Sequence, residues 1–241
     1  SSSKMKKAIR MYEQSMRYFK QVRSDIRFIF DHMSSFTNNP YYREHGNRAG
    51  YLVIAGDKGM CGGYNSEVLK LALKTIEDGA HQQKALYTIG HVAGDFFASR
   101  GMHPDVNFNH VIQDPSLRNA RAIMAEMRTR FRSKELDEVY MIYTTQPRVG
   151  VLEQKVLRLL PVLRADFDDA EILDIDSAPL AFHPSADEVF ATIIPHYLVG
   201  LFYSALVQSY ATEHYARMTA MDAATHNAEE MLGRLKLEMN H

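Results

Sequence analysis

The feature that most constrains the fold is a helical pattern of about 55 residues with no break, at the C-terminal end of the sequence. Ser185 and Glu188 open it, three residues apart as in a capping box, and the pattern continues to His241. At about 1.5 Å per residue such a helix would be about 80 Å long. The part of the chain before it, about 130 residues, has an expected radius of gyration of only about 14 Å. The helix must therefore protrude, and a second helix is needed to bury its apolar stripe.

The N-terminal segment supplies that second helix. Its apolar residues recur with a mean spacing of 3.5 residues, which is the period of a coiled-coil seam. The pattern predicts a helix over residues 1–36, ended by a loop around Pro40, and an antiparallel coiled coil between this helix and residues 185–241. The predicted seam of the first helix consists of Met5, Ile9, Tyr12, Met16, Phe19, Val22 and Ile26, and Ile29 and Met33 continue its period.

In the predicted register of this coiled coil, the numbers of two paired residues add to roughly 240. This register brings the two seams face to face. Phe19 then faces Met221 and Tyr12 faces Ala228, with Cα atoms about 8–10 Å apart. A shift by a whole heptad keeps the pattern but leaves Met5 without a partner, so we prefer the first register. It also puts the two chain ends side by side, far from the body. The predicted seam of the second helix consists of Met218, Met221, Ala228, Leu232 and Leu235.

Between the two helices, residues 50–177 alternate between strand and helix patterns. Helices are predicted over 66–78, 91–100 and 115–132. Residues 151–162 fit a strand or a helix ended by Pro161, and we favour the strand. Such alternation is typical of a mostly parallel sheet with helices on its faces. The predicted fold is α/β, a Rossmann-like body inserted between two long terminal helices that form an antiparallel coiled coil. The other strands are predicted over 51–55, 84–89, 106–111 and 138–144.

Composition excludes several classes of protein. Lys and Arg number 28 against 29 Asp and Glu, a balance that argues against a nucleic-acid binder. A single cysteine excludes an internal disulfide framework and a paired-cysteine zinc site. No run of 18 apolar residues occurs, so no direct insertion into a bilayer is expected. The start of the chain resembles no signal peptide, which favours a cytosolic location, and the lack of an initiator Met suggests a fragment or a processed chain.

One segment, residues 56–65, has the character of a site. It is a glycine-rich turn between the first strand and the first helix of the body, where doubly wound folds often hold phosphate. It lacks the terminal Gly-Lys-Ser/Thr of a phosphate loop, because Lys58 comes early and Tyr64 follows the last glycine. A tight strand-to-helix turn is the favoured interpretation. We expect no catalytic residue, no metal site and no cofactor, since Cys61 has no identifiable base and the histidines are dispersed.

Several motifs nevertheless resemble one family along the whole chain. Residues 56–65 read GDKGMCGGYN, close to the family pattern SDRGLCGGxN, and residues 3–8 read SKMKKA. The C-terminal helix carries IPHYL at 194–198, ATEHYARMTAM at 211–221 and ATHNA at 224–228. In this order the motifs resemble the gamma subunit of F-type ATP synthases. The family extends beyond both ends of this sequence, so the chain resembles a gamma subunit without the tip of its coiled coil.

The resemblance implies a mechanical and non-catalytic function. The coiled coil would be the central shaft inside a ring of alpha and beta subunits, and the body would stand on the rotor ring of c subunits beside the epsilon subunit. Proton-driven rotation would then be coupled to ATP synthesis or hydrolysis on the cytoplasmic face of a bacterial inner membrane. The resemblance also places a contact with a beta subunit at Asp57, Lys58, Gly59, Met60 and Cys61. Two alternatives stay open, a nucleotide- or phosphate-binding α/β protein and a coiled-coil adaptor.

The sequence also departs from the family pattern in the loop itself. Lys58 stands where the family has Arg, which keeps the charge but loses the planar, two-pronged donor of a guanidinium. Gly56, Thr212 and Asp222 replace the usual Ser, Ser and Lys. None of these changes is expected to alter the architecture.

Overall fold

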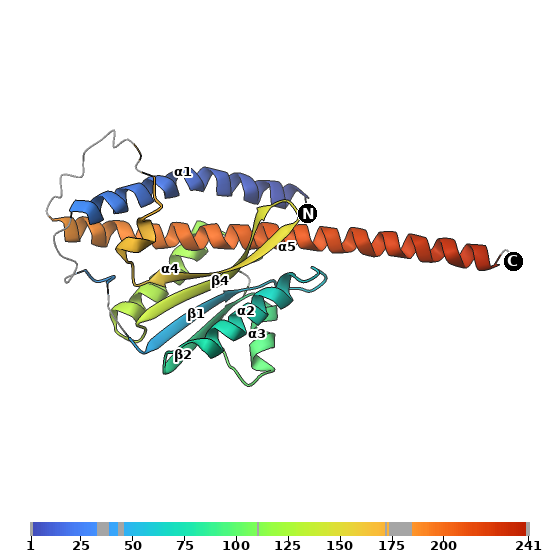
Figure 1. The fold of residues 1–241 in the computed structure, drawn as a ribbon, viewed down its shortest axis with the longest axis horizontal. Coiled ribbons are helices and arrows are strands. Elements are labelled where there is room, and N and C mark those ends of the chain that lie inside the picture. The colour runs from blue at the N-terminus through green and yellow to red at the C-terminus, as the bar shows by residue number, and fades with distance from the viewer. Residues whose placement is uncertain are drawn as a thin grey trace.

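A twisted five-stranded sheet lies against one long helix that extends well beyond it (Figure 1). The computed structural model describes residues 2–32, 39–42, 46–109, 111–171, 173 and 185–239. Its elements in chain order are α1 Ser2–His32, β1 Arg48–Ile54, α2 Tyr64–Asp78, β2 Gln83–Ile89, α3 His91–Ala98, β3 Val106–Phe108, α4 Leu117–Arg132, β4 Glu138–Arg148, β5 Val151–Leu160, a short 3-10 helix Arg164–Phe167 and α5 Ala186–Met239.

The strand order is β3-β2-β1-β4-β5, and the first four strands run parallel. β5 pairs antiparallel with β4, so the predictions of a mostly parallel sheet and of a strand after residue 150 are confirmed. Alternate residues of β1 are buried on opposite faces, as a sheet covered on both sides requires. Tyr51 and Val53 pack under α2 and α3, whereas Leu52 and Ile54 belong to the larger core shared with α1, α4 and α5.

Several boundaries in the body differ from the sequence prediction, those of β3 and α4 among them. β3 ends at Phe108, although the apolar pattern extends to residue 111. α4 begins at Leu117, because Ser116 caps it by accepting a hydrogen bond from the backbone N–H of Asn119 (3.1 Å). Pro115 therefore precedes the cap and does not occupy the first turn.

The helices α1 and α5 pack antiparallel, but the predicted register is wrong. Phe19 stacks on Tyr197, with ring centroids 5.9 Å apart, and it covers Gly200, not Met221. The opposite end of the pair is fixed by Phe30 against Phe190, with centroids 5.0 Å apart. The helix pair is therefore displaced by 20 to 24 residues, about three heptads, from the predicted register.

Contacts that the heptad pattern does not contain select the observed register. A Cβ atom at residue 200 would lie 2.9 Å from Cδ2 of Phe19, so glycine is what allows this ring to sit on α5. Near its C-terminal end α1 is anchored to the turn after β5. Arg23 donates a hydrogen bond to the backbone oxygen of Asp166 (2.8 Å), and Arg27 donates one to the backbone oxygen of Ala170 (2.5 Å).

The displaced register leaves the distal part of α5 uncovered. α1 begins beside the middle of α5, where Lys4 and His214 border one cavity, and α5 continues past it (Figure 1). Ala216 is the last buried residue of α5. The predicted pairing of the two chain ends is therefore wrong, because the described ends of α1 and α5 lie far apart. The predicted seam residues Met218, Met221, Ala228, Leu232 and Leu235 are all exposed.

On α1, the observed packing only partly follows the predicted seam. Val22 and Ile26 are buried, and Met5, Tyr12, Met16 and Phe19 are half-buried. Ile9, in contrast, is exposed. The predicted end of the first helix at 33–36, the body's boundary at residue 177 and the chain ends Ser1, Asn240 and His241 lie outside the described residues.

α5 is also the one described helix that is long and apolar enough to cross a membrane. Its most apolar stretch of 18 residues has a mean hydropathy of 1.6, although the sequence contains no uninterrupted run of 18 apolar residues. Half of that stretch is buried inside the chain. Residues such as Phe202 and Leu206, fully buried between α1 and the sheet, account for this apolar character by packing.

Candidate functional site

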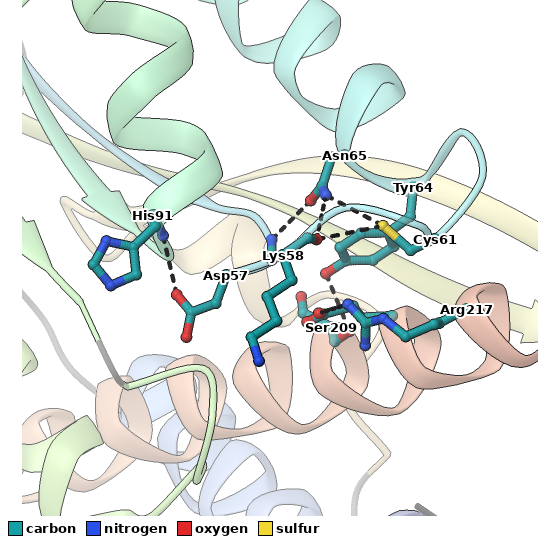
Figure 2. A network of polar contacts seen from close by, with 10 residues as sticks. Asp57, Lys58, Cys61, Tyr64, Asn65, His91, Ser209 and Arg217 are labelled. Atoms are coloured by element: carbon teal, nitrogen blue, oxygen red, sulfur yellow. Dashed lines mark hydrogen bonds and ion pairs between the residues drawn. The ribbon is translucent and has the colours of Figure 1, made fainter.

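The glycine-rich turn lies at the carboxyl end of β1 and rests on α5, close to the point where α5 leaves the body (Figure 2). Asn65, in the first turn of α2, holds its inner side together. The Asn65 side-chain oxygen accepts a hydrogen bond from the backbone N–H of Gly56 (2.8 Å). Its amide nitrogen donates to the backbone oxygen of Lys58 (3.1 Å) and to Sγ of Cys61 (3.2 Å). One buried side chain thus fixes three points of the turn.

The backbone of the turn is tightly wound. Met60 and Gly62 both have positive φ, 60° and 56°. Glycine takes this conformation without a steric penalty, whereas a methionine there is uncommon. The strained position carries an outward-pointing side chain, because Met60 is 75% exposed. The turn therefore presents a fixed exposed tip on a braced base.

The five residues predicted to contact a partner do not share one environment. Lys58, Gly59 and Met60 are exposed. Asp57 is half-buried, and its Oδ1 accepts a hydrogen bond from the backbone N–H of His91 (3.0 Å) at the start of α3. Cys61 is only 2% exposed, and burial raises the pKa of its thiol, so its side chain belongs to the interior and not to the exposed tip.

The underside of the turn is bonded to α5 by buried polar groups. The Tyr64 hydroxyl, fully buried, donates to the backbone oxygen of Ser209 (3.1 Å), and burial raises the pKa of this phenol well above its ordinary value. Glu213 forms an ion pair with Arg217 (2.6 Å) one helical turn further on. Burial raises the pKa of Glu213, and the hydrogen bond from Arg217 acts in the opposite direction. A Cβ on Gly56 would lie 2.9 Å from Oε1 of Glu213, so the turn lies directly on this pair.

The position of α5 distinguishes this turn from a phosphate-binding loop. β1 has β2 on one side and β4 on the other, and in doubly wound sheets ligands bind at such a switch in strand order, beyond the carboxyl ends. Here α5 occupies that position. Ser209 donates to the backbone oxygen of Thr144 on β4 (3.3 Å) and accepts from Tyr64 on the other side. Helix side chains fill the crevice that a nucleotide would need.

A cavity of about 370 Å³ opens beside the turn. Lys58, whose side chain extends toward α5 in Figure 2, borders it together with Lys4, His214 and the Glu213–Arg217 pair. Burial and the nearby positive charge of Arg217 lower the pKa of His214. Among the described residues no group of three metal-ligating side chains lies together. The site is thus a braced junction whose rim carries positive side chains, Lys4 and Lys58 among them, beside the carboxylates of Asp57 and Glu213.

Sequence reasoning found the turn but missed what lies beneath it. Ser209, Glu213 and Arg217 belong to the site, and they stand about 150 residues away along the chain. One signal was present in the sequence. Glu213 and Arg217 are four residues apart, so they share a helix face where an ion pair can form.

Comparisons with known proteins agree on one family. The family model described as ATP synthase matches residues 1–241. The chain is 36% identical to the ATP synthase gamma chain of Ruminiclostridium cellulolyticum over 248 residues, covering all of this chain and 83% of the relative. It is 34% identical to the ATP synthase gamma chain of Caldanaerobacter subterraneus subsp. tengcongensis, covering all of this chain and 84% of the relative.

Two solved structures share the fold. One is the central stalk and c-ring assembly of the Tetrahymena thermophila mitochondrial ATP synthase, with a TM-score of 0.63 and 18% identity, covering 93% of this chain and 98% of that chain. The other is the rotor of the Euglena gracilis mitochondrial ATP synthase, with a TM-score of 0.57 and 12% identity over the whole of both chains. At these identities the likeness concerns architecture alone.

Proposed function

Because the chain belongs to the gamma-chain family of ATP synthases, we propose that its glycine-rich turn and its protruding helix pass rotation on to the catalytic subunits of such a synthase. The chain acts as the central rotor shaft of an ATP synthase and is a non-catalytic part of it. It belongs to a complex attached peripherally to a membrane. The shaft works through its contacts with the neighbouring subunits.

The observation that carries the proposal is the uncovered distal part of α5. Residues 218–239 protrude beyond the body and beyond α1 (Figure 1). At about 1.5 Å per residue this part is about 35 Å long. Exposed apolar side chains are spread along it, among them Met218, Met221, Leu232 and Leu235. A helix with so much apolar surface needs a protein environment around it, and we assign that environment to the ring of alpha and beta subunits.

Rotation of this helix would change the conformation of the alpha and beta subunits, because the sides of the helix differ in their side chains. A rotating shaft whose sides differ presents each beta subunit in turn with a different face, so each nucleotide site is driven through states of different affinity. The work resides in the differential contacts, not in any reacting group on the shaft. We assign the exposed tip of the turn, at Lys58 to Met60, to a contact with an acidic segment of a beta subunit.

The remaining contacts belong to the end of the molecule opposite the protruding part of α5. We propose that the α/β body rests on the ring of c subunits and beside the epsilon subunit. Bacterial relatives such as that of Ruminiclostridium cellulolyticum support placing the assembly on the cytoplasmic face of the inner membrane. Proton-driven rotation of the c ring would turn the body, and α5 would transmit this rotation to the alpha and beta subunits.

Reconstitution with alpha and beta subunits tests the proposal. Leu232→Cys places a thiol on the distal part, and Lys74→Cys places a matched exposed thiol on α2 of the body. In the assembled complex a bifunctional maleimide should join residue 232 to an alpha or beta subunit and stop ATP hydrolysis. The same reagent at residue 74 should leave hydrolysis unchanged. If residue 232 stays unlinked and hydrolysis continues, the distal helix does not enter the ring.

A further inference from the structure

A second surface lies away from the turn, where α1 and α4 both pack on α5 and leave a groove between them. Its volume is about 750 Å³. Pro195, Val199 and Tyr203 of α5 line it, together with Met11 and Tyr18 of α1 and Leu117 of α4. Tyr18 is 58% exposed and Leu117 is 41% exposed, so two large apolar side chains of the lining are open to solvent. None of these residues belongs to the turn or to the distal part of α5.

Charge on the wall of the groove is of one sign. Arg121 and Arg128 of α4 line it, and no carboxylate does so among the residues that the structure describes. Nε of Arg128 is buried and finds no hydrogen-bond acceptor within that part of the chain. A buried donor without an acceptor is costly, and a charged group more so. Arg128 therefore lines the groove with part of its guanidinium group left unpaired.

We propose that this groove binds an acidic amphipathic helix of a partner protein. The apolar residues would receive the apolar face of that helix, and its carboxylates would pair with Arg121 and Arg128. The two arginines stand seven residues apart on α4, which is about 10 Å along a helix axis. The partner helix therefore carries two carboxylates about seven residues apart on one flank.

The dimensions of the groove favour a helix over an extended strand. Its lining spans residues 117–128 of α4, about 16 Å of helix axis, and the parts on α1 and α5 are shorter. About three helical turns of a partner fill this length. All three walls are helices, so no open strand edge is present in the groove for an extended peptide to bond to.

The test uses the whole chain and a synthetic helical peptide of about 15 residues. The peptide carries leucines along one face and two glutamates seven residues apart on one flank, and a matched peptide carries two lysines at those places. Fluorescence anisotropy should show that the glutamate peptide binds and that the lysine peptide binds about tenfold more weakly or worse. The double change Arg121→Glu with Arg128→Glu should reverse this preference.

Two further variants separate the groove from the general charge of α4. Arg118→Glu and Arg132→Glu change exposed arginines of the same helix that do not line the groove, and they should leave the preference as it is. Circular dichroism should confirm that every variant keeps its helices. Equal binding of both peptides to the unchanged chain, no binding of the glutamate peptide, or a preference that Arg118→Glu alters as much as the groove changes do would each overturn the proposal.

Discussion

The two halves of α5 are one continuous helix with opposite surroundings. From Ala186 to Ala216 the helix is part of the core of the body, where the sheet, α1 and α4 pack against it. From residue 218 to Met239 it is exposed on nearly all sides, although it still contains leucines and methionines. The distal half consists largely of Ala, Glu, Leu, Met, Lys and Arg, the strongest helix formers, and it continues a helix already nucleated in the body.

The difference shows that apolar residues on a helix do not by themselves say what covers them. In the proximal half their burial stabilises this chain. In the distal half the same residue types contribute little to the fold and remain free to contact other subunits. Substitutions of the same kind in the two halves should therefore separate stability from coupling.

The largest contrast is expected for one leucine in each half. Leu198 is 1% exposed, and Leu232 is 57% exposed. Leu198→Ala should lower the free energy of unfolding by about 2–5 kcal/mol, because a buried side chain leaves a cavity. Leu232→Ala should change it by no more than about 0.5 kcal/mol. Urea unfolding followed by circular dichroism measures both, and similar losses would mean that the distal half is buried in the isolated chain.

A second contrast uses the two glycines of α5. Gly200 lies under the ring of Phe19, whereas a Cβ at Gly233 would have nothing within 4 Å. Gly200→Leu should displace α1 and lower the free energy of unfolding by about 1–3 kcal/mol. Gly233→Leu should raise the free energy of unfolding by up to about 1 kcal/mol, since glycine is a poor helix former. Thermal unfolding compares the two, and stabilisation by Gly200→Leu would contradict the observed register.

Gly200 also shows which part of the fold could not be predicted from the sequence. The sheet was predictable because β1 is a continuous apolar run, and α5 was predictable because no glycine-proline cluster interrupts it. The register was not predictable, because a heptad pattern repeats after every seven residues and gives the same seam in several alignments. The choice among them depends on Phe19 fitting over Gly200 and on Arg23 reaching the turn at Asp166.

The site divides in the same way. The turn was visible in its glycines, and the exposure of Lys58 fits its position at a loop tip. The bond from Tyr64 to Ser209 and the approach of Gly56 to Glu213 depend on how α5 lies across the sheet. Contacts between residues about 150 positions apart have no local signature, so only the folded structure brings them together.

A third contrast concerns pH. Burial raises the pKa of Glu213 in the folded chain, so over a range of pH the folded state holds a proton that the unfolded state has lost. The contribution of this group to stability is fully present below the unfolded pKa of about 4.3 and is lost as the pH rises through the folded pKa. Glu213→Gln should remove this fall in unfolding free energy with rising pH.

The control for this pH effect lies in the distal half. Glu230 is an exposed carboxylate of the same helix, beside His226. Glu230→Gln removes one carboxylate without touching the junction, and it should keep the pH dependence of the unchanged chain. Urea titrations at a series of pH values from about 4 upward give the slopes. A slope that Glu213→Gln leaves unchanged would mean that this carboxyl group titrates alike in the folded and unfolded states.

The smallest effect on stability is expected at the tip of the turn, where the effect on function should be clear. The side chain of Lys58 is exposed, whereas Asn65 and Tyr64 brace the turn from within. Lys58→Ala should therefore change the free energy of unfolding by no more than about 0.5 kcal/mol. In a complex assembled with alpha and beta subunits it should alter the rate of coupled ATP hydrolysis, because a charge that faces an acidic partner segment is lost. Lys74→Ala, on an exposed face of α2, is the matched control and should change neither quantity. A large loss of stability with normal coupling would instead make Lys58 a part of the fold.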